Sequence, residues 1–332
     1  MRLLIVLPGA LGDVVRALPL LGRIRRARPD AHLGWAVEPP SAPLLVGHPW
    51  LDEVLVFDRP RGWRTLAAWL GRLAAGRWDV ALDLGRSIKS AVFARASGAR
   101  ERLAFDRGDG REGGWLLATR TLPPQGTDRS KLEQFLAFGD ALGLPPAPVE
   151  FGLAPTADER AEAAGLVAGL DGPLVAACLG SSCPSRRWFP DETAAVLEAL
   201  RARHGASAVL LGTAADAGFA AAVRRAGAAA ARDLVGRTSL RQLLALLGEA
   251  RLAFGPDSGA LHLAAALGTP AVSLWGATSA ARSTPWGGEA LAVVGAAPCA
   301  PCFLSRCPIG RVCMRAIAPD AVVAAAGKAL AR

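Results

Sequence analysis

Residues 254–270 read FGPDSGALHLAAALGTP, a run that joins the end of a buried strand to a helix through a glycine-rich turn. The apolar run 250–254 predicts the strand, and 260–267 predicts the helix, which the following glycine and proline end. Such a turn leaves backbone N–H groups unpaired at the helix N-terminus, where the helix dipole adds partial positive charge. We therefore expect a phosphate or diphosphate there, beside the carboxylate of Asp257 and the imidazole of His262. A capping serine and a core histidine are the alternative interpretation of this run.

Alternating strands and helices extend from this run in both directions. Strands are expected at 2–7, 32–37, 51–57, 80–84, 102–105, 174–179, 208–211, from 234, at 250–254 and at 271–275. Helical patterns include 14–26, 65–73, 88–96, 191–203 and 319–331. This alternation predicts parallel sheets with helices on both faces. The segment 106–129 is basic, rich in glycine and left without an assignment.

The proline-containing segment 145–155 predicts a linker between two halves of this alternation. A length of 332 residues also suggests two domains, each large enough to have a core of its own. We therefore expect domains at 1–150 and 151–332, with a last helix that could pack back on the first domain. Ligands of such sheets lie at the carboxyl ends of the strands.

The composition is basic, with a net charge of +9 and an isoelectric point near 10.2. This charge favours an anionic partner, whether nucleic acid, an acidic membrane surface or a phosphorylated substrate. No apolar run approaches the roughly 20 residues of a membrane-spanning helix, and the first residues lack the features of a signal peptide. The chain is therefore expected in the cytoplasm, and its arginines allow peripheral contact with the cytoplasmic face of the inner membrane.

Four of the six cysteines cluster near the C-terminus in the pattern C-x2-C-x4-C-x5-C, namely Cys299, Cys302, Cys307 and Cys313. In a reducing compartment such a cluster indicates metal ligands or reduced thiols rather than disulfides. Only the first two have the close spacing of a zinc knuckle. We therefore interpret the four as structural thiols, with zinc as the alternative.

The pattern D-S-G-x-x-H-x-A-A-x-x-G-x-P at 257–270 resembles the nucleotide-sugar signature of the ADP-heptose:lipopolysaccharide heptosyltransferases, glycosyltransferase family 9. The G-x-x-G-D turn at 9–13 is similar to the same family's N-terminal turn. The resemblance implies that Asp13 is the general base. A carboxylate at the carboxyl edge of the first strand could take a proton from an attacking hydroxyl. The alternative role for Asp13 is that of a helix N-cap.

Two further segments resemble the family in part. Residues 83–90 are similar to its D-L-x-G-x-x-K-S segment, with Arg86 where glycine is usual. Residues 102–112 are similar to its G-F-D-R…R-E block, with Ala104 where glycine is usual. A phosphorylated acceptor suits arginine, which binds phosphate in a bidentate manner. The residues expected to bind the acceptor are Gly12, Arg59, Arg61, Lys89, Arg107, Arg111 and Arg120.

The donor is expected in the second half. Residues 185–190 resemble the family's K-R-W-x-P segment, whose lysine contacts the donor diphosphate, and either of two arginines could supply that charge here. Asp216, after the strand at 208–211, is expected to accept hydrogen bonds from the ribose, with a helix cap as its alternative role. The residues expected to bind the donor are Ser181, Ser182, Arg186, Arg187, Asp216, Thr238, Asp257, Ser258, Gly259 and His262.

The resemblance implies a GT-B fold, in which two Rossmann-like, doubly wound α/β domains face a central cleft. It also implies inverting, metal-independent transfer of a heptose or related sugar from an ADP-sugar to the inner core of lipopolysaccharide. The expected partners are the ADP-activated donor and a phosphorylated lipid A–Kdo type acceptor, with no cofactor and no nucleic acid. The alternatives are a GT-B-like sugar-nucleotide epimerase or hydrolase, a nucleic-acid-binding protein and a silent scaffold. The sequence leaves open the donor sugar and whether the first or second heptose is added.

Overall fold

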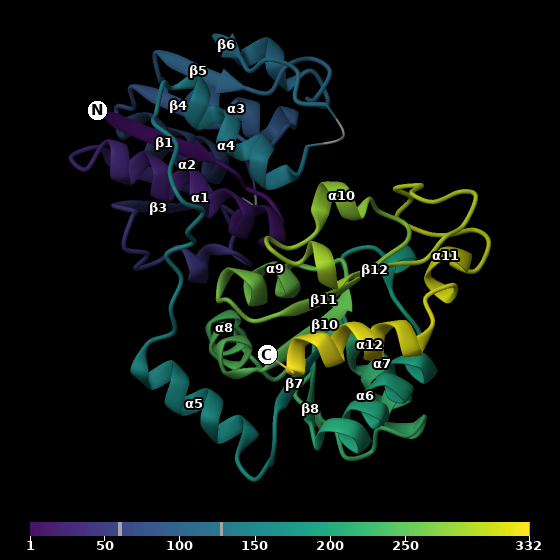
Figure 1. The fold of residues 1–332 in the computed structure, drawn as a ribbon. Coiled ribbons are helices and arrows are strands. Elements are labelled where there is room, and N and C mark those ends of the chain that lie inside the picture. Colours follow the sequence, from purple (N-terminus) through teal and green to yellow (C-terminus); the bar gives the residue numbers. More distant parts are fainter. Residues whose placement is uncertain (59–61, 127–128, 332) are drawn as a thin grey trace. The chain divides into compact units, whose positions relative to one another are not determined.

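The computed structural model describes residues 1–58, 62–126 and 129–331 (Figure 1). It divides into two compact units, Met1–Leu153 and Ala154–Arg332. Each unit contains one six-stranded sheet in which every described strand pair is parallel. The prediction of two Rossmann-like, doubly wound α/β domains is therefore confirmed. No helix within the described ranges is both long enough and apolar enough to cross a membrane.

The first unit has the strand order β3-β2-β1-β4-β5-β6. Its strands are β1 (Arg2–Val6), β2 (His32–Val37), β3 (Glu53–Val56), β4 (Val80–Asp83), β5 (Glu101–Ala104) and β6 (Arg120–Thr121). Its helices are α1 (Leu11–Ala27), α2 (Trp63–Ala75), α3 (Ile88–Ala96) and α4 (Lys131–Ala141), with the 3-10 turns η1 (Ala42–Leu44) and η2 (Gly114–Leu117).

Helices α2 and α3 pack side by side on this sheet. Trp69 of α2 and Phe93 of α3 have ring centroids 4.2 Å apart, and both contact Phe57 at the end of β3. They share one buried cluster with Leu4 and Val6 of β1, whose side chains point to the same face because strand residues two apart do so. Helices α1 and α4 pack against each other.

The second unit has the order β12-β11-β10-β7-β8-β9. Its strands are β7 (Leu174–Cys178), β8 (Ser207–Leu211), β9 (Arg232–Asp233), β10 (Leu252–Pro256), β11 (Ala271–Trp275) and β12 (Ala292–Val294). Its longer helices are α5 (Ala157–Val167), α6 (Pro190–His204), α7 (Ala217–Arg225), α8 (Leu240–Glu249), α9 (Gly259–Ala266) and α12 (Pro319–Leu330). Its short turns are η3 (Pro184–Arg186), η4 (Ala214–Asp216), α10 (Ala280–Ser283), η5 (Glu289–Leu291) and α11 (Val312–Arg315). The last helix, α12, packs against α6 and the strands β10, β11 and β12.

Both sheets reverse their strand order at one point, between β1 and β4 in the first unit and between β7 and β10 in the second. In open α/β sheets, ligands bind outside the carboxyl ends of the strands at such a switch point. The switch points therefore locate one candidate site in each unit.

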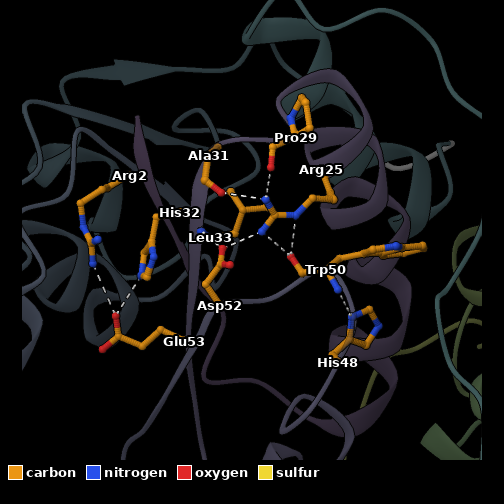
Figure 2. Close-up of polar contacts among 10 residues, drawn as sticks. All are labelled: Arg2, Arg25, Pro29, Ala31, His32, Leu33, His48, Trp50, Asp52 and Glu53. Carbon is orange, nitrogen blue, oxygen red and sulfur yellow. Dashed lines mark hydrogen bonds and ion pairs between the residues drawn. The ribbon is translucent and has the colours of Figure 1, made fainter.

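A polar network ties the opposite, amino edge of the first sheet together (Figure 2). Arg25 donates to Asp52 Oδ2 at 2.6 Å and to the carbonyl oxygens of Pro29, Ala31 and Trp50. Burial acts to raise the pKa of Asp52, but hydrogen bonds from the Leu33 N–H and from Arg25 outweigh it, so that the pKa is lowered. This arginine therefore holds the end of α1 to the starts of β2 and β3.

Candidate active site

Asp13 follows the carboxyl end of β1, on the first turn of α1. The N-cap of this helix is Ala10, so Asp13 is not the N-cap, which was the alternative role considered for it. Its carboxylate oxygen Oδ1 lies 2.5 Å from Arg16 Nη1 and 3.0 Å from Lys131 Nζ. The side chain is 28% exposed. Two cations, from α1 and α4, therefore hold a partly exposed carboxylate at the first switch point.

A second carboxyl group, Asp83, ends β4 on the other side of this switch point, where it is paired in register with Val6. Asp83 is buried and accepts a hydrogen bond from the Gly85 N–H at 3.0 Å. Burial raises its pKa to about 6, against the opposing effect of hydrogen bonds from Ser90 and Gly85. Asp83 lies in a family-like motif of the sequence that assigned it no role. Asp83 is buried because other elements pack around β4, and a short motif does not show that packing.

Lys89, predicted to bind the acceptor, lies on the first turn of α3. Its Nζ is 2.6 Å from Oε1 of Glu38, which follows β2. Gly12, another predicted acceptor residue, is buried in the first turn of α1. Lys89 is therefore at the carboxyl edge of the sheet, and its charge is paired with Glu38.

The predicted acceptor arginines have different surroundings. Arg107 and Arg111 are exposed in the loop between β5 and η2. Arg120 donates to Glu101 Oε1 at 3.1 Å, at the start of β5, and to a carbonyl oxygen at the end of α4 at 2.7 Å. Two further predicted acceptor residues, Arg59 and Arg61, lie outside the described residues. Arg107, Arg111 and Arg120 are thus all exposed, and Arg120 is the one whose guanidinium is held by the contacts just described.

The second switch point requires a glycine. Gly255 of β10 has a φ of +157°, and a Cβ on it would lie 2.2 Å from the carbonyl oxygen of Cys178 at the end of β7. Beyond this close approach, Ser181 Oγ donates to the Asp257 carbonyl oxygen at 2.8 Å, joining the loops that follow the two strands. Ser182 lies next to it in the same loop.

The two predicted arginines of this site each pair with a predicted carboxylate. Arg186 Nη1 lies 3.1 Å from Asp257 Oδ2, which also accepts from Thr278 Oγ1 at 3.0 Å. Arg187 Nη2 lies 2.8 Å from Oδ1 of the buried Asp216. Both arginines therefore belong to the carboxyl edge of this sheet. Sequence analysis missed Thr278, which follows β11 and has no motif of its own.

Asp216 also organises its own loop. Its Oδ2 accepts hydrogen bonds from the backbone N–H and the hydroxyl of Thr213, at 2.9 and 2.8 Å. Gly236 N donates to Gly212 O at 3.0 Å, so the loop that contains the half-buried Thr238 lies beside the Asp216 loop. The structure therefore brings these two predicted donor residues into neighbouring loops.

Helix α9 begins at Gly259, with Ser258 as its N-cap. Ser258 makes no capping hydrogen bond through its side chain, and its buried Oγ has no hydrogen-bond partner among the described residues. His262 is buried in the first turn of the helix. The hydroxyl thus lies at the start of the helix without acting as the cap that the alternative interpretation required.

The cysteines form no disulfide among the described residues. Cys307 Sγ accepts from the Arg311 N–H at 3.1 Å, and Cys313 is buried. Within the described ranges, no three or more His, Cys, Asp or Glu side chains are placed to hold a metal ion. The segment from Cys299 to Cys307 contacts the loop that contains Arg186 and Arg187. The contact is a hydrogen bond from the Ser185 N–H to the carbonyl oxygen of Ser305 at 3.2 Å.

Known proteins resemble this chain over most of its length. The model of glycosyltransferase family 9 (heptosyltransferase) matches residues 67–312. Lipopolysaccharide heptosyltransferase 1 of Pseudomonas aeruginosa is 29% identical over 323 residues, which are 92% of this chain and 87% of that protein. Lipopolysaccharide core heptosyltransferase OpsX of Haemophilus influenzae is 24% identical over 280 residues, 83% of this chain and 79% of that protein.

A solved structure extends this likeness to the fold. The Escherichia coli ADP-heptose lipopolysaccharide heptosyltransferase II has a TM-score of 0.81 with this chain at 23% sequence identity. The match covers 100% of this chain and 99% of the Escherichia coli chain. This likeness supports the two-domain fold predicted from the sequence.

Proposed function

The chain belongs to glycosyltransferase family 9, and from this membership we propose that it transfers a heptose from an ADP-activated donor to the inner core of lipopolysaccharide. The names of its relatives support a heptose as the sugar and lipopolysaccharide as the acceptor. A lipid A–Kdo type acceptor and peripheral contact with the inner membrane are further parts of the proposal. The single observation that carries it is the carboxyl edge of the second sheet, where two arginines and the start of α9 lie together. The Ser258 hydroxyl at this helix start has no hydrogen-bond partner among the described residues.

The donor half of the reaction is assigned to the second unit. The diphosphate would lie at the N-terminus of α9, where backbone N–H groups and the helix dipole favour an anion. The Ser258 hydroxyl would donate a hydrogen bond to the diphosphate. Arg186 would release its hydrogen bond to Asp257 and donate to a diphosphate oxygen instead. Such fixed donors stabilise charge that develops on the leaving group, so the proposal requires no metal ion.

Beside the diphosphate, the loops of Asp216 and Thr238 would hold the nucleoside. Asp216 already accepts two hydrogen bonds from Thr213 through Oδ2 and faces Arg187 through Oδ1. A ribose hydroxyl would donate to this carboxylate, as the resemblance implies. Arg187 would then neutralise the charge of a buried group that binds a neutral sugar.

The acceptor half is assigned to the first unit. Asp13 would take the proton of the acceptor hydroxyl as that oxygen attacks the anomeric carbon, and the bond to the diphosphate would break on the opposite side. A single displacement of this kind inverts the anomeric configuration. Arg16 and Lys131 would keep the Asp13 carboxylate oriented during the attack. Arg107 and Arg111 would bind phosphate groups of the acceptor.

The variant Asp13→Asn tests this assignment. The amide keeps the shape of the side chain but is no useful base, so transfer should fall by at least about 100-fold. Donor affinity, measured by calorimetry, should change little because the donor is held by the other unit. Asp30→Asn, a change at an exposed aspartate after α1, is the matched control and should leave both quantities unchanged. Unimpaired turnover of Asp13→Asn would remove Asp13 from the role of base.

Two further measurements test the finer parts of the proposal. The anomeric configuration of the product, determined by nuclear magnetic resonance, should be opposite to that of the donor. Transfer should also continue in excess chelator. A retained configuration would contradict the single displacement, and loss of activity that added metal restores would contradict the metal-independent mechanism.

A further inference from the structure

Large apolar side chains are exposed on three neighbouring elements of the first unit. They are Trp63 and Leu66 of α2, Ile88 and Val92 of α3, and Leu116 of η2. Trp63 is 73% exposed and Leu116 is 77% exposed, the two highest values among the large apolar side chains that the structure describes. We call these five residues the α2–α3–η2 surface.

The three elements lie next to one another. α2 packs against α3, and α3 packs against η2 (α2 and α3 are labelled in Figure 1). A Cβ on Gly114, the first residue of η2, would lie 3.0 Å from the carbonyl oxygen of Ser87 at the start of α3. Within each helix the exposed residues are three or four apart, a spacing that places them on one side of the helix. The five exposed apolar residues therefore lie on three adjacent elements.

This surface borders the carboxyl edge of the first sheet. Trp63 and Ile88 are the first residues of α2 and α3, which follow the carboxyl ends of β3 and β4. The turn η2 follows β5. Asp13 follows β1 at the same edge, because all these strands are parallel. A molecule held on the surface would thus be held at the edge that carries the proposed base.

Arginines border the surface, together with one exposed carboxylate, Glu112, whose Oε2 accepts from the Ile88 N–H at 3.2 Å. Neither α2 nor α3 contains an aspartate or a glutamate. Arg64 is exposed beside Trp63, with its guanidinium carbon 5.5 Å from the ring centroid, and Arg95 is exposed on α3. Arg107 and Arg111 are exposed before η2. Exposed tryptophan and leucine flanked by arginine suit the boundary between acidic headgroups and acyl chains.

The core of the unit does not account for these exposed residues. Trp69 and Leu73 provide the buried contacts of α2, and Phe93 and Ala94 provide those of α3. Single exposed apolar residues are common, but a group of them on adjacent elements marks an interaction surface. The high exposure of Trp63 and Leu116 therefore favours a role in contact with a partner.

We propose that the α2–α3–η2 surface binds the headgroup region of an anionic lipid bilayer, with Trp63 and Leu116 entering the boundary of the acyl chains. This inference rests on the proposed function, in which the acceptor is a lipid held in such a bilayer. The surface holds the first unit at the membrane so that the acceptor headgroup meets the edge that carries Asp13.

Flotation of the full chain with vesicles tests the proposal. The chain should float with vesicles of phosphatidylglycerol and phosphatidylethanolamine, and poorly with vesicles of phosphatidylcholine alone. The double variant Trp63→Ser, Leu116→Ser should bind the anionic vesicles about tenfold more weakly, because the apolar area that entered the lipid is lost. Higher salt should weaken the binding of both proteins, because the arginine charges are then screened.

The matched control is the double variant Val46→Ser, Val294→Ser. Its two residues are 64% and 61% exposed, lie on other elements and should leave vesicle binding unchanged. Thermal unfolding of each variant should match that of the parent chain, since none of the four side chains is buried. Transfer to a delipidated, water-soluble acceptor should be the same for the parent chain and for Trp63→Ser, Leu116→Ser. If the parent chain floats but transfers nothing, the proposed function fails and the lipid-binding surface stands.

Three outcomes would overturn the lipid-binding surface. The first is equal flotation of the parent chain and Trp63→Ser, Leu116→Ser, or no flotation of the parent chain. The second is loss of flotation in Phe303→Ser, Leu304→Ser instead, since these residues are exposed in the second unit. The third is a lipid-free dimer, seen by sedimentation, that the Trp63→Ser, Leu116→Ser change dissociates, because the surface would then bind a second copy of the chain.

Discussion

A single buried carboxyl group gives the first unit an unusual dependence on pH. Burial raises the pKa of Asp83 to about 6, from an ordinary value of 3.8. Between about pH 4 and pH 6 the folded chain therefore keeps a proton that the unfolded chain has released, so the free energy of unfolding falls as the pH rises. Above pH 6 the full cost of the buried charge is present, on the order of 2–3 kcal/mol.

The variant Asp83→Asn removes this cost. Its amide oxygen can accept from the Gly85 N–H, as the carboxylate does, and its NH2 group can donate to Ser90 Oγ. We expect a higher free energy of unfolding than the parent at pH 7.5 and nearly the same value at pH 4, measured by urea denaturation. The exposed-site variant Asp30→Asn should show no such difference. A variant that is less stable than the parent at pH 7.5 would contradict the cost assigned to the buried charge of Asp83.

Individual residues of the site could be predicted where a local motif contains them. Asp13, Ser258 and the paired arginines all lie in short patterns after strands, where the chain order itself places them at the carboxyl edge. Lys131 could not be predicted, because it reaches Asp13 from a position 118 residues away in sequence. For Asp83 the sequence shows the motif but does not show that the side chain is buried, because burial depends on packing and not on neighbours in sequence.

At the scale of one strand pair, Gly255 determines how closely β10 and β7 approach at the carboxyl edge of the second sheet. A Cβ there would lie 2.2 Å from the carbonyl oxygen of Cys178, so Gly255→Ala has to push β10 and β7 apart. We expect a loss of about 1–3 kcal/mol in the free energy of unfolding, and a weaker affinity for ADP. Gly218→Ala on α7 is the matched control, because nothing lies within 4 Å of the added methyl group. That control should gain about 0.5–1 kcal/mol, and equal stability of the two variants would contradict the close-approach argument.

The central elements of both sheets could be predicted, but three edge strands could not. The strand expected from residue 234 is β9 in the structure, which ends at Asp233. β1 has four consecutive apolar residues after Arg2, β7 has five, and all five residues of β10 are buried. Such runs indicate strands that are covered on both faces. The edge strands β6 and β12 are two and three residues long, too short for a periodic pattern, and sequence analysis missed both. The pairing of an edge strand depends on the neighbour that it meets, which a window of sequence does not contain.

Over the whole molecule, the charge of +9 has several uses that composition cannot separate. Arg25 has its guanidinium bound to carbonyl oxygens and a carboxylate within the first unit (Figure 2). Arg186 and Arg187 neutralise carboxylates at the carboxyl edge of the second sheet. Arg64 and Arg95 are exposed on helices without acidic residues. A basic composition therefore favoured an anionic partner without showing which arginines would meet it.

Because each unit has its own sheet and switch point, ADP should protect one unit more than the other. Hydrogen exchange of the full chain, followed by mass spectrometry, should slow most at the backbone N–H groups of residues 180–187 and 257–261 when ADP is added. These groups surround the start of α9, where the proposal places the diphosphate. UDP is the control ligand: it carries the same diphosphate and should protect the same groups less, because the loops of Asp216 and Thr238 are proposed to hold an adenosine. Strongest protection at residues 9–14, after β1, would instead place the nucleotide on the first unit and reverse the proposed roles of the two sheets.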